Sequence, residues 1–157
     1  MRRKILVVED DPDQLEVIRL SLEAAGFAIG TAANGRDALV KTRSISPDLI
    51  LLDVMLPGLN GFDVCESLRR DPATASIPII MLTGLRSQFG RFAGLESGAN
   101  DFLLKPFNPN QLVSKVETLL GRVCASSNKQ NKSKPDPGGH RLRKKAFPAG
   151  SDVERNN

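Results

Sequence analysis

Five short apolar runs alternate with stretches of helical spacing along the first 120 residues. The runs cover residues 4–8, 27–31, 49–53, 77–82 and 99–104. Between and after them, apolar residues recur at helical spacing, which predicts helices over residues 12–25, 36–43, 62–70, 86–97 and 109–120. Strands and helices that alternate through short connections are typical of a parallel sheet with helices on both faces. The sequence therefore predicts a doubly wound α/β fold.

Residues that favour helix ends support the first of these helices. Asp11 is a good N-cap, and Pro12 stands at the first helical position, where its missing N–H costs nothing. Residues 86–97 are the weakest case, because Gly90 and Gly94 each lower helix stability by about 1 kcal/mol relative to Ala. We expect this helix to be the least stable element.

Polar side chains stand where four of the predicted strands end. Glu9 and Asp10 follow the first strand, Asp53 ends the third, Thr83 follows the fourth and Lys105 follows the fifth. Parallel strands bring their carboxyl ends to one edge of the sheet, so these side chains are expected to share a crevice. Each residue alone has a simpler interpretation as a helix cap, a turn residue or a solvated charge. Their occurrence at successive strand ends favours a functional site.

The predicted crevice has the chemistry of phosphoryl transfer onto a carboxylate. Carboxylates that lie close together repel one another, and an oxygen-only ligand set suits Mg²⁺. Lys105 supplies a positive charge for a phosphoryl oxygen, and Thr83 supplies a hydroxyl donor. Asp53 needs no general base because a carboxyl group is ionised near neutral pH. The pattern therefore predicts that Asp53 is a nucleophile beside a magnesium site.

Residues 1–120 resemble the receiver domain of bacterial two-component response regulators, including the single-domain chemotaxis type. The resemblance covers the whole predicted folded part and implies a flavodoxin-like (βα)5 sheet with strand order 2-1-3-4-5. The segments that carry it are Ile5-Leu6-Val7-Val8-Glu9-Asp10-Asp11, Leu52-Asp53-Val54-Met55-Leu56-Pro57-Gly58, Met81-Leu82-Thr83, Gly98-Ala99-Asn100-Asp101 and Lys105-Pro106-Phe107.

The resemblance implies a phosphorylation site and a metal site. Asp53 would accept a phosphoryl group from a sensor histidine kinase or a histidine phosphotransfer protein. Glu9 and Asp10 would hold Mg²⁺ together with Asp53 and the backbone carbonyl of Met55. The protein would then be a stand-alone signalling switch and not a metabolic enzyme.

The resemblance also implies how the phosphoryl group is bound and sensed. Thr83 and Lys105 would bind it, and the peptide bond between Lys105 and Pro106 would be cis, a form tolerated only before proline. Thr83 would move toward the phosphoryl group, and Phe102 would rotate into the vacated space without the hydrogen bond that a tyrosine could make. The face made by the fourth helix, the fifth strand and the fifth helix would then bind a downstream effector protein.

Two alternatives use the same fold differently. A metal-dependent phosphohydrolase with an aspartate nucleophile usually has a second aspartate two residues further on, but Met55 stands there. A constitutive binding scaffold would keep the fold without using phosphorylation. The presence of every residue of the acceptor site argues against the scaffold.

The charge divides the chain into an acidic body and a basic tail. Residues 1–120 hold 13 Lys and Arg against 15 Asp and Glu, a net of −2, whereas residues 121–157 hold nine against three, a net of +6. We expect a receiver domain over residues 1–121 and a disordered tail over 122–157, too short and polar for a DNA-binding output domain. The basic cluster at residues 140–145 could contact nucleic acid, an anionic membrane or an acidic partner, or could simply aid solubility.

Location and metal content follow from what the sequence lacks. No apolar run approaches the roughly 20 residues of a membrane span, and only four apolar residues separate the basic start from Glu9, too few for a signal peptide. We therefore expect a cytoplasmic protein. Cys65, Cys124 and His140 lack zinc-binding spacing, and the two cysteines need not form a disulfide.

Overall fold

A five-stranded parallel sheet forms the centre of the computed structural model, which describes residues 2–84 and 96–132. The strand order β2-β1-β3-β4-β5 confirms the predicted fold class and strand order. The predicted helix at 86–97 lies almost wholly outside the described residues. The elements are β1 (Lys4–Val8), α1 (Pro12–Ala24), β2 (Ala28–Ala32), α2 (Gly35–Ile45), β3 (Leu49–Asp53), α3 (Gly61–Arg70), β4 (Ile79–Thr83), β5 (Asp101–Leu104) and α5 (Pro109–Lys132).

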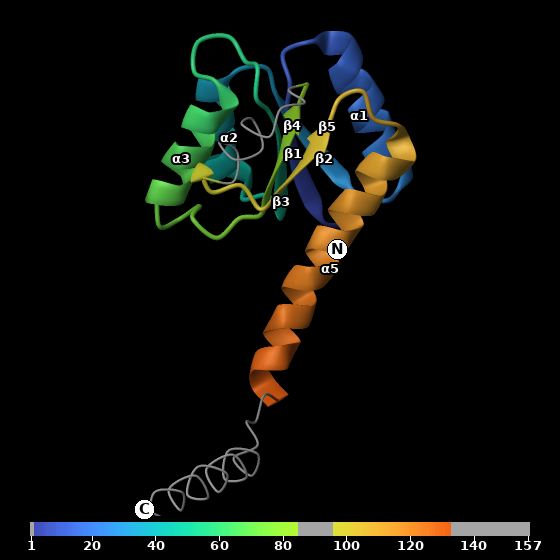
Figure 1. Ribbon diagram of the computed structural model, residues 1–157, viewed down its shortest axis with the longest axis vertical. Coiled ribbons are helices and arrows are strands. Elements are labelled where there is room, and N and C mark those ends of the chain that lie inside the picture. Colours follow the sequence, from blue (N-terminus) through green and yellow to red (C-terminus); the bar gives the residue numbers. More distant parts are fainter. Residues whose placement is uncertain (1, 85–95, 133–157) are drawn as a thin grey trace, which may run out of the picture. The chain divides into compact units, whose positions relative to one another are not determined.

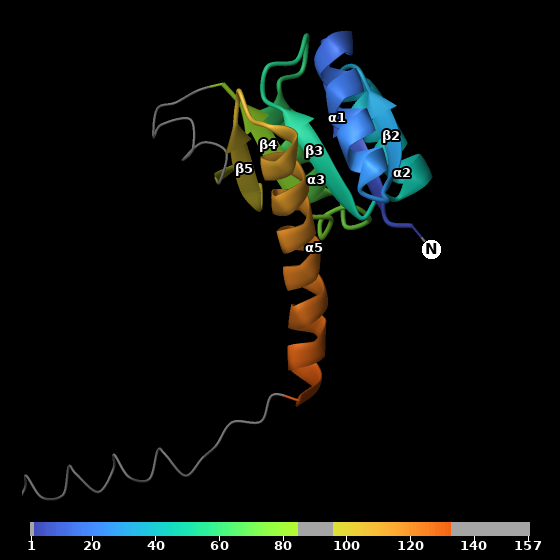
Figure 2. The same ribbon diagram turned by 90° about the vertical axis from the view of Figure 1, so that its right-hand side faces the viewer.

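Helices cover both faces of the sheet because successive strand residues point to opposite sides. Ile5 and Val7 pack in one core with residues of α1 and α5, whereas Leu6 and Val8 pack in a second core with residues of α2 and α3. Figures 1 and 2 show this layering, with α1 and α5 on one side of the sheet and α2 and α3 on the other. The central strands β1, β3 and β4 are therefore apolar along most of their length.

Side-chain caps fix where the helices begin. Asp11 accepts a hydrogen bond from the backbone N–H of Asp13, as the sequence predicted for the start of α1. Asn34 and Asn60 cap α2 and α3 in the same way. Asn108 accepts from the N–H of Gln111 at 2.8 Å, and the Gln111 side chain accepts from the N–H of Asn108 at 3.0 Å. This reciprocal capping box begins α5 directly after the segment that carries Lys105.

Two features differ from the simplest interpretation of the apolar pattern. The first helix, predicted over residues 12–25, ends at Ala24, and Ala25 is its exposed C-cap residue. Helix α5 continues past Gly121 to Lys132, although the apolar pattern ends near residue 120. The chain divides into a unit of Met1–Val123, which holds the sheet, and a unit of Cys124–Asn157. Residues 122–132, predicted to belong to a disordered tail, are helical because α5 continues through them. The disorder predicted for residues 133–157, with the basic cluster at 140–145, lies outside the described residues and stays a prediction.

Among the residues that the structure describes, every helix is too short or too polar to cross a lipid bilayer.

Candidate functional site

The acidic residues predicted to share a crevice lie together at the carboxyl-terminal edge of the sheet. Val8 of β1 pairs with Leu52 of β3, so the next residues, Glu9 and Asp53, stand side by side. Both side chains are buried, with residue exposures of 1% and 3%, while Asp10 is exposed. Carboxylate oxygens of Glu9, Asp10 and Asp53 all lie within 4.8 Å of one another.

Lys105 reaches this cluster from the end of the edge strand β5. Its backbone N–H donates to the carbonyl of Thr83 at 2.8 Å, which aligns the residue after β5 with the end of β4. Its Nζ donates to Glu9 Oε1 at 3.0 Å and to Asp53 Oδ2 at 3.1 Å. One ammonium group therefore bridges the two buried carboxylates.

Burial and charge shift the pKa values of the bridged groups. Burial raises the pKa of Glu9 above its usual value, the hydrogen bond from Lys105 opposes this, and the charge of Asp53 adds to the rise. Burial alone would lower the pKa of Lys105, but its hydrogen bonds and the charges of Glu9 and Asp53 outweigh burial and raise it. Lys105 is therefore held in its charged form, and its contacts are charge-assisted hydrogen bonds.

The backbone behind Asp53 is held tightly. Asp53 Oδ1 accepts a hydrogen bond from the N–H of Met55 at 3.1 Å, and the N–H of Gly61 donates to the carbonyl of Val54 at 2.9 Å. A Cβ at Gly61 would overlap the carbonyl oxygen of Asp53 and lie 2.8 Å from Val54 Cα. The first residue of α3 thus packs directly on the end of β3, and only glycine fits there.

The donor set fits a hard divalent cation. It consists of carboxylate oxygens, two of them buried and one exposed to solvent. Mg²⁺ prefers such oxygens and keeps several waters, which the exposed Asp10 side of the cluster allows. The three acids also outnumber the single ammonium of Lys105, so a cation would relieve the remaining repulsion. Glu9, Asp10 and Asp53 could therefore hold Mg²⁺.

The other predicted site residues lie at the neighbouring strand ends. Thr83 is buried at the end of β4, and Phe102 of β5 pairs with Met81 and is half-buried against the core beside α3. The Lys105–Pro106 peptide bond, for which the resemblance implied the cis form, is cis in the structure. The roles assigned to Thr83 and Phe102 stay predictions.

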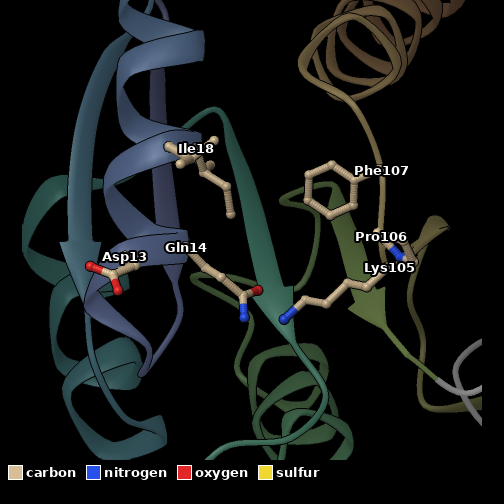
Figure 3. A pocket seen from close by; sticks show the side chains of 7 residues that line it. Asp13, Gln14, Ile18, Lys105, Pro106 and Phe107 are labelled. Atoms are coloured by element: carbon tan, nitrogen blue, oxygen red, sulfur yellow. The ribbon is translucent and has the colours of Figure 1, made fainter.

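A cavity of about 520 Å³ adjoins this site and was not predicted from the sequence. It lies between α1 and the segment after β5, and Figure 3 shows Gln14 and Lys105 facing each other across it. Its sequence signal was Val17, an apolar residue of α1 that lies outside the buried stripe of that helix and lines the cavity. The lining residues are Asp13, Gln14, Val17, Ile18, Lys105, Pro106 and Phe107.

Comparison with known families identifies a response regulator receiver domain over residues 5–117. Among curated proteins, the DNA-binding response regulator MtrA of Mycolicibacterium smegmatis is 46% identical over 122 residues, which is 78% of this chain and 52% of MtrA. The alkaline phosphatase synthesis transcriptional regulatory protein PhoP of Bacillus subtilis is 42% identical over 78% of this chain and 50% of its own length. The chain thus spans about half the length of these curated relatives.

Solved structures agree with this match. A putative response regulator from Chloroflexus aurantiacus superposes with a TM-score of 0.74 at 39% identity, over 77% of this chain and 99% of that protein. The chemotaxis protein CheY4 of Vibrio cholerae superposes with a TM-score of 0.72 at 33% identity, over 75% and 98% of the two chains. Both likenesses cover about three quarters of this chain and nearly the whole of the other protein.

Proposed function

This chain belongs to the family of response regulator receiver domains, and we propose that its Asp53 accepts a phosphoryl group from a histidine kinase or a histidine phosphotransfer protein. The observation that carries the proposal is the Lys105 ammonium, which lies 3.0 Å from Glu9 Oε1 and 3.1 Å from Asp53 Oδ2. A buried carboxylate beside a fixed positive charge and two further acids has the parts that phosphoryl transfer requires.

In the proposed reaction, an oxygen of Asp53 forms a bond to phosphorus while the bond from phosphorus to the donor's imidazole nitrogen breaks. The imidazole nitrogen keeps the electron pair of the broken bond, and the carboxylate oxygen of Asp53 supplies the electron pair of the new one. Lys105 and Thr83 would bind the oxygens of the incoming group. Bound Mg²⁺, held by Glu9, Asp10, Asp53 and the Met55 carbonyl, would supply charge neutralisation.

The proposed output is a change of protein partner. Thr83 would move toward the phosphoryl group, Phe102 would turn inward, and the face predicted to consist of the fourth helix, β5 and α5 would bind an effector protein. The fourth helix of this prediction lies almost wholly outside the described residues. The protein would act as a switch in the cytoplasm, without turnover of a metabolite. A constitutive scaffold remains the alternative function.

The cavity beside Lys105 is the surface where we place the protein donor. A donor has to approach Asp53 from the solvent side, and this cavity shares Lys105 with the acceptor site. Apolar Val17 and Leu20 are 56% and 53% exposed on the same helix that forms one wall. Such a surface suits an amphipathic helix of the donor that presents a phosphohistidine.

Intact-mass measurement after incubation with acetyl phosphate and Mg²⁺ tests the proposal. The expected result is a gain of about 80 Da, one phosphoryl group, that disappears without Mg²⁺ and in Asp53→Asn. Asp63→Asn, the same change at an exposed carboxylate, is the matched control and should keep the gain. If neither acetyl phosphate nor a histidine kinase adds a phosphoryl group to Asp53, the scaffold function replaces this one.

A further inference from the structure

The side chain of Arg69, in the last turn of α3, forms hydrogen bonds with segments that are distant in the sequence. Its guanidinium donates to the carbonyls of Gly98 at 2.8 Å, Ala75 at 3.0 Å and Ile77 at 2.7 Å, and to Asn100 Oδ1 at 2.8 Å. All four acceptors are neutral oxygens of the chain on either side of β4 and before β5. The rigid fork of an arginine can hold such a set, whereas the single ammonium of a lysine cannot.

Asn100 connects this fork to the sheet. Its Oδ1 also accepts from the N–H of Ile79 at 2.8 Å, and its own N–H donates to the Ile79 carbonyl at 2.9 Å. Asn100 is thus paired with the first residue of β4. Strand β5 starts at the next residue, with Asp101 opposite Ile80.

The register of β5 against β4, which begins at Asp101, determines the position of Lys105. From Asp101 opposite Ile80, the pairing runs to Leu104 opposite Thr83, and Lys105 then bonds the Thr83 carbonyl. A slip of one residue would turn every following side chain to the opposite face of the sheet. Within the described strand β5, only Leu103 is buried, so burial alone specifies the register weakly.

We propose that Arg69 is a positioning residue for the phosphorylation of Asp53, because with Asn100 it locks the register of β5 and so places Lys105. This inference rests on the proposed function. It assigns Arg69 a role at the opposite end of the sheet from the reacting atoms. The neighbouring Arg70 offers the contrast, since its side chain is 79% exposed and lies 3.8 Å from Glu66.

Paired substitutions test the proposal through two readouts. The first is the phosphorylation rate of Asp53 by acetyl phosphate and Mg²⁺ per folded molecule, and the second is the β4–β5 pairing observed by NMR contacts between backbone protons. Arg69→Gln and Asn100→Ala are expected to lower the rate by about tenfold or more, because small misplacements at a distance have effects of this size. Both should also alter the pairing of residues 101–104.

Two controls keep the test specific. Arg70→Gln changes the adjacent arginine in the same turn and should leave the rate within about twofold of wild type. Asn100→Asp keeps an oxygen at the position of Oδ1 and should likewise keep the wild-type rate and the native pairing. If Arg69→Gln fails to fold, Asn100→Ala and Asn100→Asp decide the question.

The outcomes separate this proposal from the proposed function. A native β4–β5 pairing in Arg69→Gln, or a wild-type rate per folded molecule, would overturn the positioning role. Arg69 would then contribute only to the stability of the fold. If the wild-type protein takes no phosphoryl group, the proposed function fails. The pairing readout then still decides whether Arg69 sets the register.

Discussion

A basic side chain forms hydrogen bonds near each end of strand β5, and the two side chains bond different kinds of group. Lys105 follows the strand and bonds two carboxylates, Glu9 and Asp53. Arg69 acts before the strand and bonds carbonyl oxygens, three of them on the backbone. The charges of its carboxylate partners raise the pKa of Lys105, whereas burial lowers the pKa of Arg69.

The difference indicates which positive charge can take part in chemistry. The oxygens of a phosphoryl group carry the same negative charge as the carboxylates, so they can replace the carboxylates as partners of the lysine ammonium. No group in the proposed reaction could replace the arginine at the backbone carbonyls, so each carbonyl would lose its hydrogen-bond partner. Lys105 is therefore suited to exchange its contacts, and Arg69 is suited to keep them.

The largest effect expected is on the unfolding free energy of Arg69→Gln. The substitution leaves several carbonyl oxygens without a partner and should destabilise the fold by about 3 kcal/mol. Lys105→Gln should lower stability by less than Arg69→Gln, because burial already raises the pKa of Glu9 and favours its neutral form when the ammonium is lost. Urea unfolding of both variants measures this, and equal losses would contradict the contrast.

A second effect concerns the fixed backbone of the acidic edge. Gly61→Ala should destabilise the protein by about 2 kcal/mol, since the new Cβ would meet the backbone of Asp53 and Val54. Gly121→Ala is the control, because its Cβ would meet nothing within 4 Å and alanine should stabilise the helix by up to about 1 kcal/mol. Thermal unfolding compares the two, and a neutral Gly61→Ala would show that α3 can shift.

A third prediction concerns the protein donor, which we place at the cavity beside Lys105. Val17→Asp should slow phosphotransfer from a histidine kinase by about tenfold, because it places a charge in an apolar contact. The rate with acetyl phosphate should stay unchanged. Val40→Asp on α2, also an exposed valine, is the matched control. Equal slowing by both substitutions would place the donor elsewhere.

The smallest effect expected is a pH dependence confined to the Lys105 region. The pKa of Glu9 is raised in the folded state, so the native protein binds more protons than the unfolded chain, and stability falls as pH rises from the usual carboxyl value through the raised one. The pKa of Lys105 is also raised, which adds stability that is lost only as pH rises through that higher value.

Unfolding free energies measured against pH test this sign. Glu9→Gln should remove the fall in the acid range, whereas Arg69→Gln should keep it, because carbonyl partners do not titrate. Mg²⁺ affinity should also weaken on acidification, since the ligands have to be ionised. A Glu9→Gln profile parallel to wild type would contradict the assignment.

The sequence was sufficient for the sheet and the acidic edge because both depend on local pattern. Short apolar runs with turn residues on both sides, such as residues 49–52, favour buried strands, and parallel topology then brings Glu9, Asp53 and Lys105 to one edge. Arg69 could not be found this way, since an arginine in the last turn of a helix also suits the helix dipole. Three of its four partners are backbone carbonyls of other segments, which no residue pattern encodes. The apolar pattern likewise reports burial, so it ended near residue 120 although α5 continues to Lys132.

A crystal structure with Mg²⁺ and beryllofluoride, a stable mimic of the phosphoryl group, would test the central claim most directly. We predict density for the mimic on Asp53 and for a metal ion beside Glu9 and Asp10. Lys105 Nζ should then bond the mimic, while the four hydrogen bonds of Arg69 stay in place. An Asp53 without the mimic, or a Lys105 that still bridges Glu9 and Asp53, would contradict the account.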